Sequence, residues 1–261
     1  MSFQSKGKLA IIQLEKIKRI IVAGDLHGDF SSLKKIIKIF NPNEDLIIFL
    51  GDYADRGEKS VEVIEEIKNL IKEHSKKVIA LKGNHEDYFD YGEPKFSPCT
   101  LIQEVERKIG SWNLYFKSFK KDFLDKLYIA AEIQNYALFV HAGVSRKVKS
   151  EKDLINPSKD VEEDLIWSDP FDEEGEYPNP RGAGILYGKD VSKEVCERLN
   201  VKFIIRSHEP MKALSNPFVE HDGRVITISS TSVYGGRPFV LILPAKNFPK
   251  SKEIEKYVAF L

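Results

Sequence analysis

The sequence predicts an α/β fold that contains two β-sheets. In the first third of the chain, short β-branched runs alternate with segments whose apolar residues recur at helical spacing, which is typical of parallel βαβ units. In the last third, apolar runs follow one another with little helical pattern between them. This second observation favours a further sheet, mixed or antiparallel.

The individual elements follow from local patterns. Residues 31–40 and 60–71 each place apolar side chains on one helical face, so both are expected to be amphipathic helices. Residues 145–181 are acidic and show little periodicity, and we expect them to form a long surface excursion. The apolar runs expected to form buried strands are 17–23, 45–50, 77–81, 136–140, 202–206, 224–229 and 238–243.

Composition narrows the class of protein. The 261 residues are 42% hydrophobic, which suffices for one large core, so we expect a single catalytic domain over residues 1–261. The 40 basic and 40 acidic residues cancel, which argues against nucleic acid as a partner. Without an apolar run of membrane-spanning length or a signal-peptide pattern, the chain is expected in the cytoplasm with no membrane partner. Cys99 and Cys196 define no disulfide framework.

Polar residues follow five of the expected strands, next to glycine or other small residues. In open α/β sheets, ligands bind outside the carboxyl ends of the strands, so these five ends are expected to converge on one place. The five ends read GDLHG (24–28), GDYADRG (51–57), GNHED (83–87), HAGVS (141–145) and RSHEP (206–210).

The side chains at these ends suit divalent metal ions. Asp25 and His27 are one residue apart, so in an extended segment they would point the same way. Mixed carboxylate, amide and imidazole donors favour manganese, iron or zinc. The candidate ligands exceed the needs of one closed site and suit two ions with a shared carboxylate, best Asp52. They are Asp25, His27, Asp52, Asn84, His141 and His208.

Each motif alone also has a plainer interpretation. Gly-Asp after a strand is often a turn with a helix cap, and a lone histidine at a strand end is more often structural than a ligand. The joint pattern argues against coincidence. Four of the six histidines lie at these strand ends, namely His27, His85, His141 and His208.

In order and spacing, GDLHG, GDYADRG and GNHE resemble the phosphoprotein phosphatase family of calcineurin-like metallophosphoesterases, which includes serine/threonine phosphatases. The resemblance implies a central β-sandwich of two mixed sheets flanked by helices, with the site at one edge. It continues along nearly the whole chain through LYIAAEI (127–133), HAGVS, IWSDP (166–170), PRG (180–182), RSHEP and VYGG (233–236).

The resemblance also implies a role for each matching residue. Asp25, His27 and Asp52 would hold one metal ion, and Asp52, Asn84, His141 and His208 would hold the second. His85 would be the general acid, oriented by Asp55. Arg56, Arg181 and Tyr234 would bind the substrate phosphate. Each also has a plainer interpretation: Arg56 could form a local salt bridge, Arg181 could be a surface charge, and Tyr234 could be a packed tyrosine. Trp167 is expected to support the core or a loop.

The chain departs from the eukaryotic members at several motifs. It has HAG where they usually have HGG, RSHE where they have RAHQ, and STSVYGG where they have APNYCG. Tyr128 stands where they have proline. These differences resemble a prokaryotic, archaeal-type branch, and they leave regulatory subunits an open question.

The expected function is a metal-dependent hydrolase that removes phosphate from phosphoserine and phosphothreonine proteins. Two divalent ions, with manganese favoured and iron or zinc as alternatives, would activate a bridging hydroxide for direct attack on phosphorus. The alternative is a diadenosine tetraphosphate hydrolase or another nucleotide-directed relative. Such relatives tend to lack the aspartate before the arginine in the second motif, so Asp55 favours the protein phosphatase. A non-catalytic scaffold is disfavoured because every matching position is present.

Overall fold

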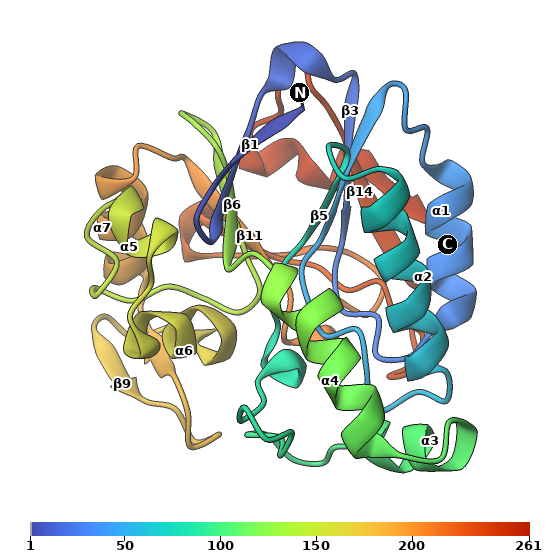
Figure 1. Ribbon diagram of the computed structural model, residues 1–261. Coiled ribbons are helices and arrows are strands. Elements are labelled where there is room, and N and C mark those ends of the chain that lie inside the picture. The colour runs from blue at the N-terminus through green and yellow to red at the C-terminus, as the bar shows by residue number, and fades with distance from the viewer. Residues whose placement is uncertain (1) are drawn as a thin grey trace.

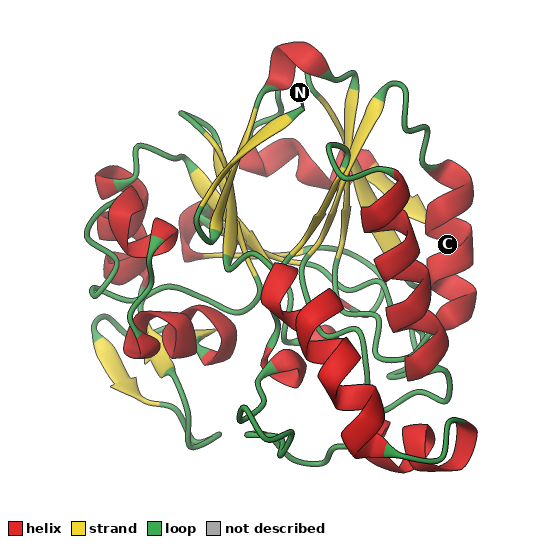
Figure 2. Ribbon diagram, in the orientation of Figure 1, coloured by secondary structure: helices red, strands yellow, loops and turns green. Residues whose placement is uncertain are grey.

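In the computed structural model, which describes residues 2–261, successive side chains of strand β3 (Arg19–Ala23) lie in two different cores. Ile20 and Val22 face the interior between two sheets, whereas Ile21 and Ala23 pack against helices on the outer side. Side chains alternate between the faces of a strand, so a strand that is apolar throughout must be covered on both faces. Figure 2 shows the two larger sheets at the centre, with helices on their outer sides.

The first sheet has five strands in the order β15-β14-β3-β4-β5. Strands β3, β4 and β5 run parallel, and β14 pairs with β3 in the antiparallel sense, so the sheet is mixed. The other members are β4 (Asp45–Phe49), β5 (Val78–Ala80), β14 (Phe239–Pro244) and β15 (Val258–Phe260).

The second sheet has seven strands in the order β1-β2-β6-β7-β11-β13-β12 and is also mixed. Strand β11 pairs in parallel with β7 and β13, whereas β6 and β7 are antiparallel. Its strands are β1 (Phe3–Lys6), β2 (Leu9–Ile12), β6 (Ala130–Ile133), β7 (Ala137–Val140), β11 (Phe203–Arg206), β12 (Phe218–Glu220) and β13 (Val225–Thr227). A small third sheet contains β8 (Asp169–Pro170), β10 (Ile185–Tyr187) and β9 (Glu176–Pro178).

Helices cover the outer face of each large sheet (Figure 1). The five-stranded sheet packs against α1 (Phe30–Ile39), α2 (Ser60–Glu73), α3 (Leu101–Lys108) and α4 (Trp112–Asp122). The seven-stranded sheet packs against α5 (Glu151–Ile155), α6 (Lys159–Trp167) and α7 (Lys189–Arg198). Short 3-10 helices are η1 (Leu14–Lys16), η2 (Asn84–Glu86), η3 (Leu124–Lys126), η4 (Pro210–Ala213), η5 (His221–Gly223) and η6 (Ser251–Tyr257).

The predicted α/β class with two mixed sheets is confirmed, and all seven expected strands are present within a few residues of their predicted bounds. The run at 238–243 was expected in the second sheet with the other strands of the last third. It forms β14, which instead joins the first sheet beside β3. Helices α3, α4 and α7 were not expected from the sequence.

The expected surface excursion at 145–181 is wrong in its first half. This segment contains α5 and α6, and Leu154, Val161 and Leu165 are buried against the seven-stranded sheet. Burial of each such side chain stabilises the fold by about 1.5–3 kcal/mol, which holds the segment on the sheet. Acidic residues between the apolar ones hid the helical spacing of α6. Within residues 2–261, none of the helices has the length and apolar character needed to cross a lipid bilayer.

Candidate active site

The five strand ends with polar residues meet in one place, but they come from both sheets. Asp25, Asp52 and Asn84 follow β3, β4 and β5 of the five-stranded sheet. His141 and His208 follow β7 and β11 of the seven-stranded sheet. The candidate site therefore lies where the edges of two facing sheets approach each other, and each sheet contributes part of it.

The turns that carry these residues are sterically demanding. His27, Asp52 and His208 have left-handed backbone angles, with φ of 46°, 53° and 70°. Non-glycine residues in this region cost about 1–3 kcal/mol each and gather at functional sites. A Cβ atom on Gly51 would lie 2.8 Å from His141 Nδ1, so only glycine fits between the two sheets at this point. Asp25 and His27 do come together, but the expectation of an extended segment is wrong because His27 is left-handed.

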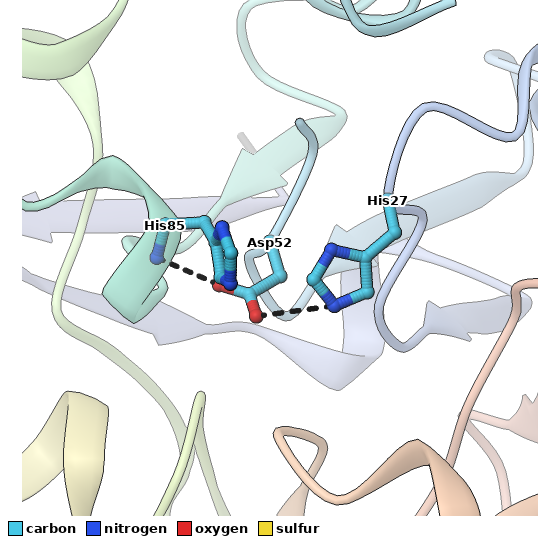
Figure 3. A group of neighbouring side chains, drawn as sticks. All are labelled: His27, Asp52 and His85. Atoms are coloured by element: carbon cyan, nitrogen blue, oxygen red, sulfur yellow. Dashed lines mark hydrogen bonds and ion pairs between the residues drawn. The ribbon is translucent and has the colours of Figure 1, made fainter. Parts of the chain in front are cut away.

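Asp25, His27 and Asp52 form the first group of candidate ligands. His27 Nε2 lies 3.8 Å from Asp25 Oδ2 and 3.5 Å from Asp52 Oδ2, which is too far for hydrogen bonds. Ligand atoms about 2 Å from one cation are separated by about this much. His27 Nδ1 donates to the carbonyl oxygen of Ala54 over 2.9 Å, so the Nε2 lone pair faces the carboxylates. Figure 3 shows Asp52 between His27 and His85.

Asp52, Asn84, His141 and His208 form the second group. His141 Nε2 lies 3.3 Å from Asp52 Oδ1 and 3.1 Å from Asn84 Oδ1. His208 Nδ1 lies 2.9 Å from Asn84 Oδ1 and 3.2 Å from His141 Nε2. His141 Nδ1 donates to the Leu50 carbonyl oxygen over 2.9 Å, which again turns the Nε2 lone pair inward.

These atoms fit divalent cations. Among residues 2–261, buried Asp25 Oδ2 has no hydrogen-bond partner. The Asn84 amide faces His141, His208 and Asp52: its oxygen could share a cation with them, whereas the reversed amide would donate to the same atoms. Burial lowers the pKa of His27 to about 3 and lowers the pKa of His141 and of His208. All three imidazoles are therefore neutral at pH 7, the form that binds metal.

Asp52 belongs to both groups, and its environment disfavours the ionised carboxylate where no cation is bound. Burial, followed by the nearby charges of Asp25 and Glu86, raises its pKa well above the ordinary value. Positive charge at this point would restore the ionised form. Asp52 thus lies between the two groups, with Oδ2 toward His27 and Oδ1 toward His141.

His85 and Asp55 form a hydrogen-bonded pair beside the ligand groups. His85 Nδ1 lies 2.7 Å from Asp55 Oδ2, and the two side chains are 6% and 0% exposed. Burial would raise the pKa of Asp55, but hydrogen bonds from His85 and from the Leu101 and Thr100 backbone outweigh it and lower the pKa. Asp55 is therefore charged and fixes one orientation of the imidazole, as expected for a positioned acid.

A cleft of about 300 Å³ opens over both groups. The predicted phosphate-binding residues Arg56, Arg181 and Tyr234 all line it. Trp167 was expected to support the core or a loop, but it also lines the cleft, with its ring centroid 5.9 Å from that of His208. The predicted residues in the lining are His27, Asp52, Arg56, Asn84, His85, Trp167, Arg181, His208 and Tyr234.

Two further charged residues of these motifs, Asp169 and Glu86, had no predicted role. Asp169 of IWSDP accepts from Arg181 Nε over 2.8 Å and from Arg206 Nη2 over 2.9 Å. Glu86 of GNHED accepts backbone N–H bonds from Asp52, Tyr53 and Gly83 over 2.9, 3.1 and 3.0 Å. The signal that was available for both is a charged residue inside a motif of the resemblance.

Comparison with known proteins agrees with this geometry. Residues 18–212 match the family model described as calcineurin-like phosphoesterase. The chain belongs to the calcineurin-like phosphoesterase family. A Caenorhabditis elegans relative named "Putative serine/threonine-protein phosphatase C27B7.6" is 34% identical over an alignment of 240 residues, and the match covers 85% of this chain and 50% of that protein. This member of the family thus spans about half the length of that curated relative.

Solved structures show the same phosphoesterase fold. A Saccharomyces cerevisiae protein serine/threonine phosphatase, described as similar to human phosphatase PP5, superposes with a TM-score of 0.75 at 25% identity. That match covers 91% of this chain and 76% of the yeast chain. A cold-active protein-tyrosine phosphatase of a Shewanella species has a TM-score of 0.59 at 17% identity, covering 92% and 78% of the two chains. The predicted family and fold are confirmed.

Proposed function

We propose that this phosphoesterase is a metal-dependent phosphomonoester hydrolase that removes phosphate from phosphoserine and phosphothreonine in proteins. One observation carries the proposal: two buried groups of candidate ligand atoms share Asp52, and members of both line the same cleft as His85, which is paired with Asp55. Divalent ions held by Asp25, His27, Asp52, Asn84, His141 and His208 would supply Lewis acidity and lower the pKa of water.

The cleft arginines are assigned to the phosphate group. Arg181 is held through Nε by Asp169, which leaves its two terminal amino groups for phosphate oxygens. Arg56 lines the cleft beside it. Guanidinium groups form paired, charge-assisted hydrogen bonds to phosphate, and they would stabilise the negative charge that spreads over its oxygens during displacement. Tyr234 lines the cleft with its ring centroid 5.5 Å from that of His27, and it is assigned a phosphate contact.

His85 is assigned the proton transfer to the leaving group. When water attacks phosphorus, the bond from phosphorus to the serine or threonine oxygen breaks, and the resulting alkoxide takes a proton from the imidazole. Asp55 orients the ring through its contact with Nδ1. No covalent phosphoenzyme is needed. Burial raises the pKa of Cys99 to about 11 and that of Cys196 to about 12, so both are weak nucleophiles at neutral pH.

Two observations support a protein substrate over a dinucleotide. Asp55 stands before Arg56 in the second motif, where nucleotide-directed relatives tend to lack it. The C. elegans relative and the yeast structure are both named serine/threonine phosphatases. The archaeal-type branch, the single domain over 1–261, the cytoplasmic location and the absence of nucleic-acid and membrane partners stay predictions of the sequence.

The test begins with protein stripped of metal by a chelator and dialysed. Stripped protein is expected to be inactive, and manganese is expected to restore hydrolysis of phosphoserine and phosphothreonine peptides. Iron and zinc are assayed in parallel to identify the preferred pair. Full activity of the stripped protein would refute the metal requirement, and hydrolysis of diadenosine tetraphosphate in preference to all peptides would refute the proposed substrate class.

A further inference from the structure

The chain that leaves η2 folds back on itself and returns to the candidate acid. Residues 87–95 form a hairpin in which Lys95 N donates to the Asp87 carbonyl oxygen over 2.9 Å, and Phe89 N donates to the Glu93 carbonyl oxygen over 2.8 Å. Lys95 Nζ also lies 3.1 Å from an Asp87 carboxylate oxygen. Trp112 of α4 donates from Nε1 to the Gly92 carbonyl oxygen over 2.9 Å, which fixes the tip of the hairpin.

The hairpin delivers Phe96 onto the His85 ring. The two ring centroids are 4.5 Å apart with an interplanar angle of 49°, and Phe96 is only 7% exposed. The His27 ring lies against His85 as well, at 4.9 Å and 87°. The His85 imidazole therefore contacts two rings: that of His27, which is a candidate ligand, and that of Phe96, which is not.

Phe96 is itself held by the core. Its ring lies edge-to-face with Tyr88 at 5.3 Å, and Tyr88 packs against Trp112 and Phe116 of α4 at 5.7 and 5.6 Å. An aromatic chain thus runs from a core helix to the His85 ring. Each such pair contributes about 0.5–1.5 kcal/mol beyond simple burial, so the position of Phe96 is well defined.

The residues after Phe96 hold the partner of His85. Leu101 N donates to Asp55 Oδ1 over 2.8 Å, and the Thr100 backbone and hydroxyl groups approach the same oxygen. The other oxygen, Asp55 Oδ2, is the one bonded to His85 Nδ1. One segment, residues 96–101, therefore contacts both members of the pair.

We propose that Phe96 is a positioning residue that holds the His85 imidazole in line with the leaving group; this inference rests on the proposed function. One hydrogen bond at Nδ1 fixes a point on the ring, but the ring can still tilt about that bond. Contact with a flat, anchored aromatic face removes the tilt and keeps Nε2 directed into the cleft. Displacement of a catalytic group by about 1 Å can cost about 100-fold in rate.

The first experiment compares Phe96→Leu with wild type on two manganese-loaded reactions. The phosphoserine peptide has a poor leaving group that needs a proton, whereas p-nitrophenyl phosphate needs little protonation. We expect kcat on the peptide to fall at least about tenfold and kcat on the aryl ester to change by less than about twofold. Equal losses on both substrates would overturn the proposal. Phe96→Met, whose unbranched and flexible side chain adapts more readily to the space left by the ring, serves if the leucine variant is not folded.

Phe89→Leu is the matched control, because Phe89 lies in the same hairpin, is 43% exposed and stacks on Tyr91 away from His85. This control is expected to keep the wild-type ratio of the two rates. A shift of that ratio as large as the one in Phe96→Leu would overturn the proposal, since the hairpin as a whole would then be responsible.

A double-mutant cycle with His85→Asn tests whether Phe96 acts through His85. In the His85→Asn background, Phe96→Leu is expected to change the peptide rate by less than about twofold, because no acid remains to be positioned. A further loss of about tenfold would overturn the proposal. Wild-type protein that is inactive on both esters would instead refute the proposed function, so the two failures are distinguishable.

Discussion

Arg206 donates from Nη2 to Asp169 Oδ1 over 2.9 Å, and the two side chains are 0% and 7% exposed. The second carboxylate oxygen of Asp169 accepts from Arg181 Nε over 2.8 Å. Burial would raise the pKa of Asp169, but Arg206 and Arg181 outweigh burial and hold the pKa below its ordinary value. Buried Arg206 therefore helps to keep Asp169 charged, and Asp169 in turn orients Arg181 in the cleft.

Asp169→Asn should weaken phosphate binding. The amide has one acceptor oxygen and cannot satisfy both arginines, so Arg181 loses its fixed orientation. We expect KM for a phosphopeptide and the inhibition constant of inorganic phosphate each to rise about tenfold, which corresponds to about 1.4 kcal/mol. Steady-state kinetics with and without phosphate measure both. Asp172→Asn, at an exposed position nearby, should change neither constant. Unchanged constants in Asp169→Asn would show that Arg181 is held without this carboxylate.

Asp52→Asn should abolish metal loading and activity together, because both ligand groups share this side chain. The metal-free protein should at the same time become more stable, since the substitution removes a carboxylate whose charged form is disfavoured by burial, Asp25 and Glu86. We expect its thermal midpoint to rise by about 2–4 °C. Elemental analysis and thermal melts of stripped samples check the two effects. Asp90→Asn, at a side chain that is 96% exposed, is the control, and full metal content in Asp52→Asn would contradict the shared-ligand assignment.

His85→Asn should separate alkyl from aryl substrates. Loss of the proton donor is expected to lower kcat on a phosphoserine peptide by about 10²–10⁴-fold, whereas p-nitrophenyl phosphate should lose much less. Metal content should be close to that of wild type, because the ligand groups keep the other histidines. Parallel assays on both esters give the comparison, and equal losses would count against a general-acid role.

Glu132 provides a stability prediction away from the cleft. Burial in β6, followed by the charge of Glu151, raises its pKa to about 7, and Oε2 lacks a hydrogen-bond partner among residues 2–261. A carboxylate with a raised folded pKa contributes stability below its unfolded pKa, about 4.3, and this contribution is lost as the pH rises through 7.

Glu132→Gln should therefore stabilise the protein at pH 8, by about 1–3 kcal/mol, and have little effect at pH 4. Urea unfolding at the two pH values measures this difference. The exposed Glu255→Gln gives the baseline, with a change of less than about 0.5 kcal/mol at either pH. An effect of Glu132→Gln that is the same at both pH values would indicate a packing change rather than removal of a buried charge.

The strands and the candidate ligands were predictable because each has a local signature. An apolar strand buried on both faces reads as a continuous β-branched run, as in 45–50, and the candidate ligand that follows it stands beside glycine. Asp52 and Asn84 were found this way. His141 and His208 were found by the same signature, although the sequence did not indicate that they come from the other sheet.

Only the tertiary structure decided which residues support the ligands and the proposed acid. Phe96 lies on His85 because a hairpin and an aromatic chain from α4 bring it there, and no periodicity in residues 88–100 encodes that return. Asp169 of the small third sheet lies between Arg181 and Arg206, a contact that joins β8 to the end of β11. Local composition determines which segments form strands and where polar residues end them, whereas contacts between distant segments depend on how whole layers pack.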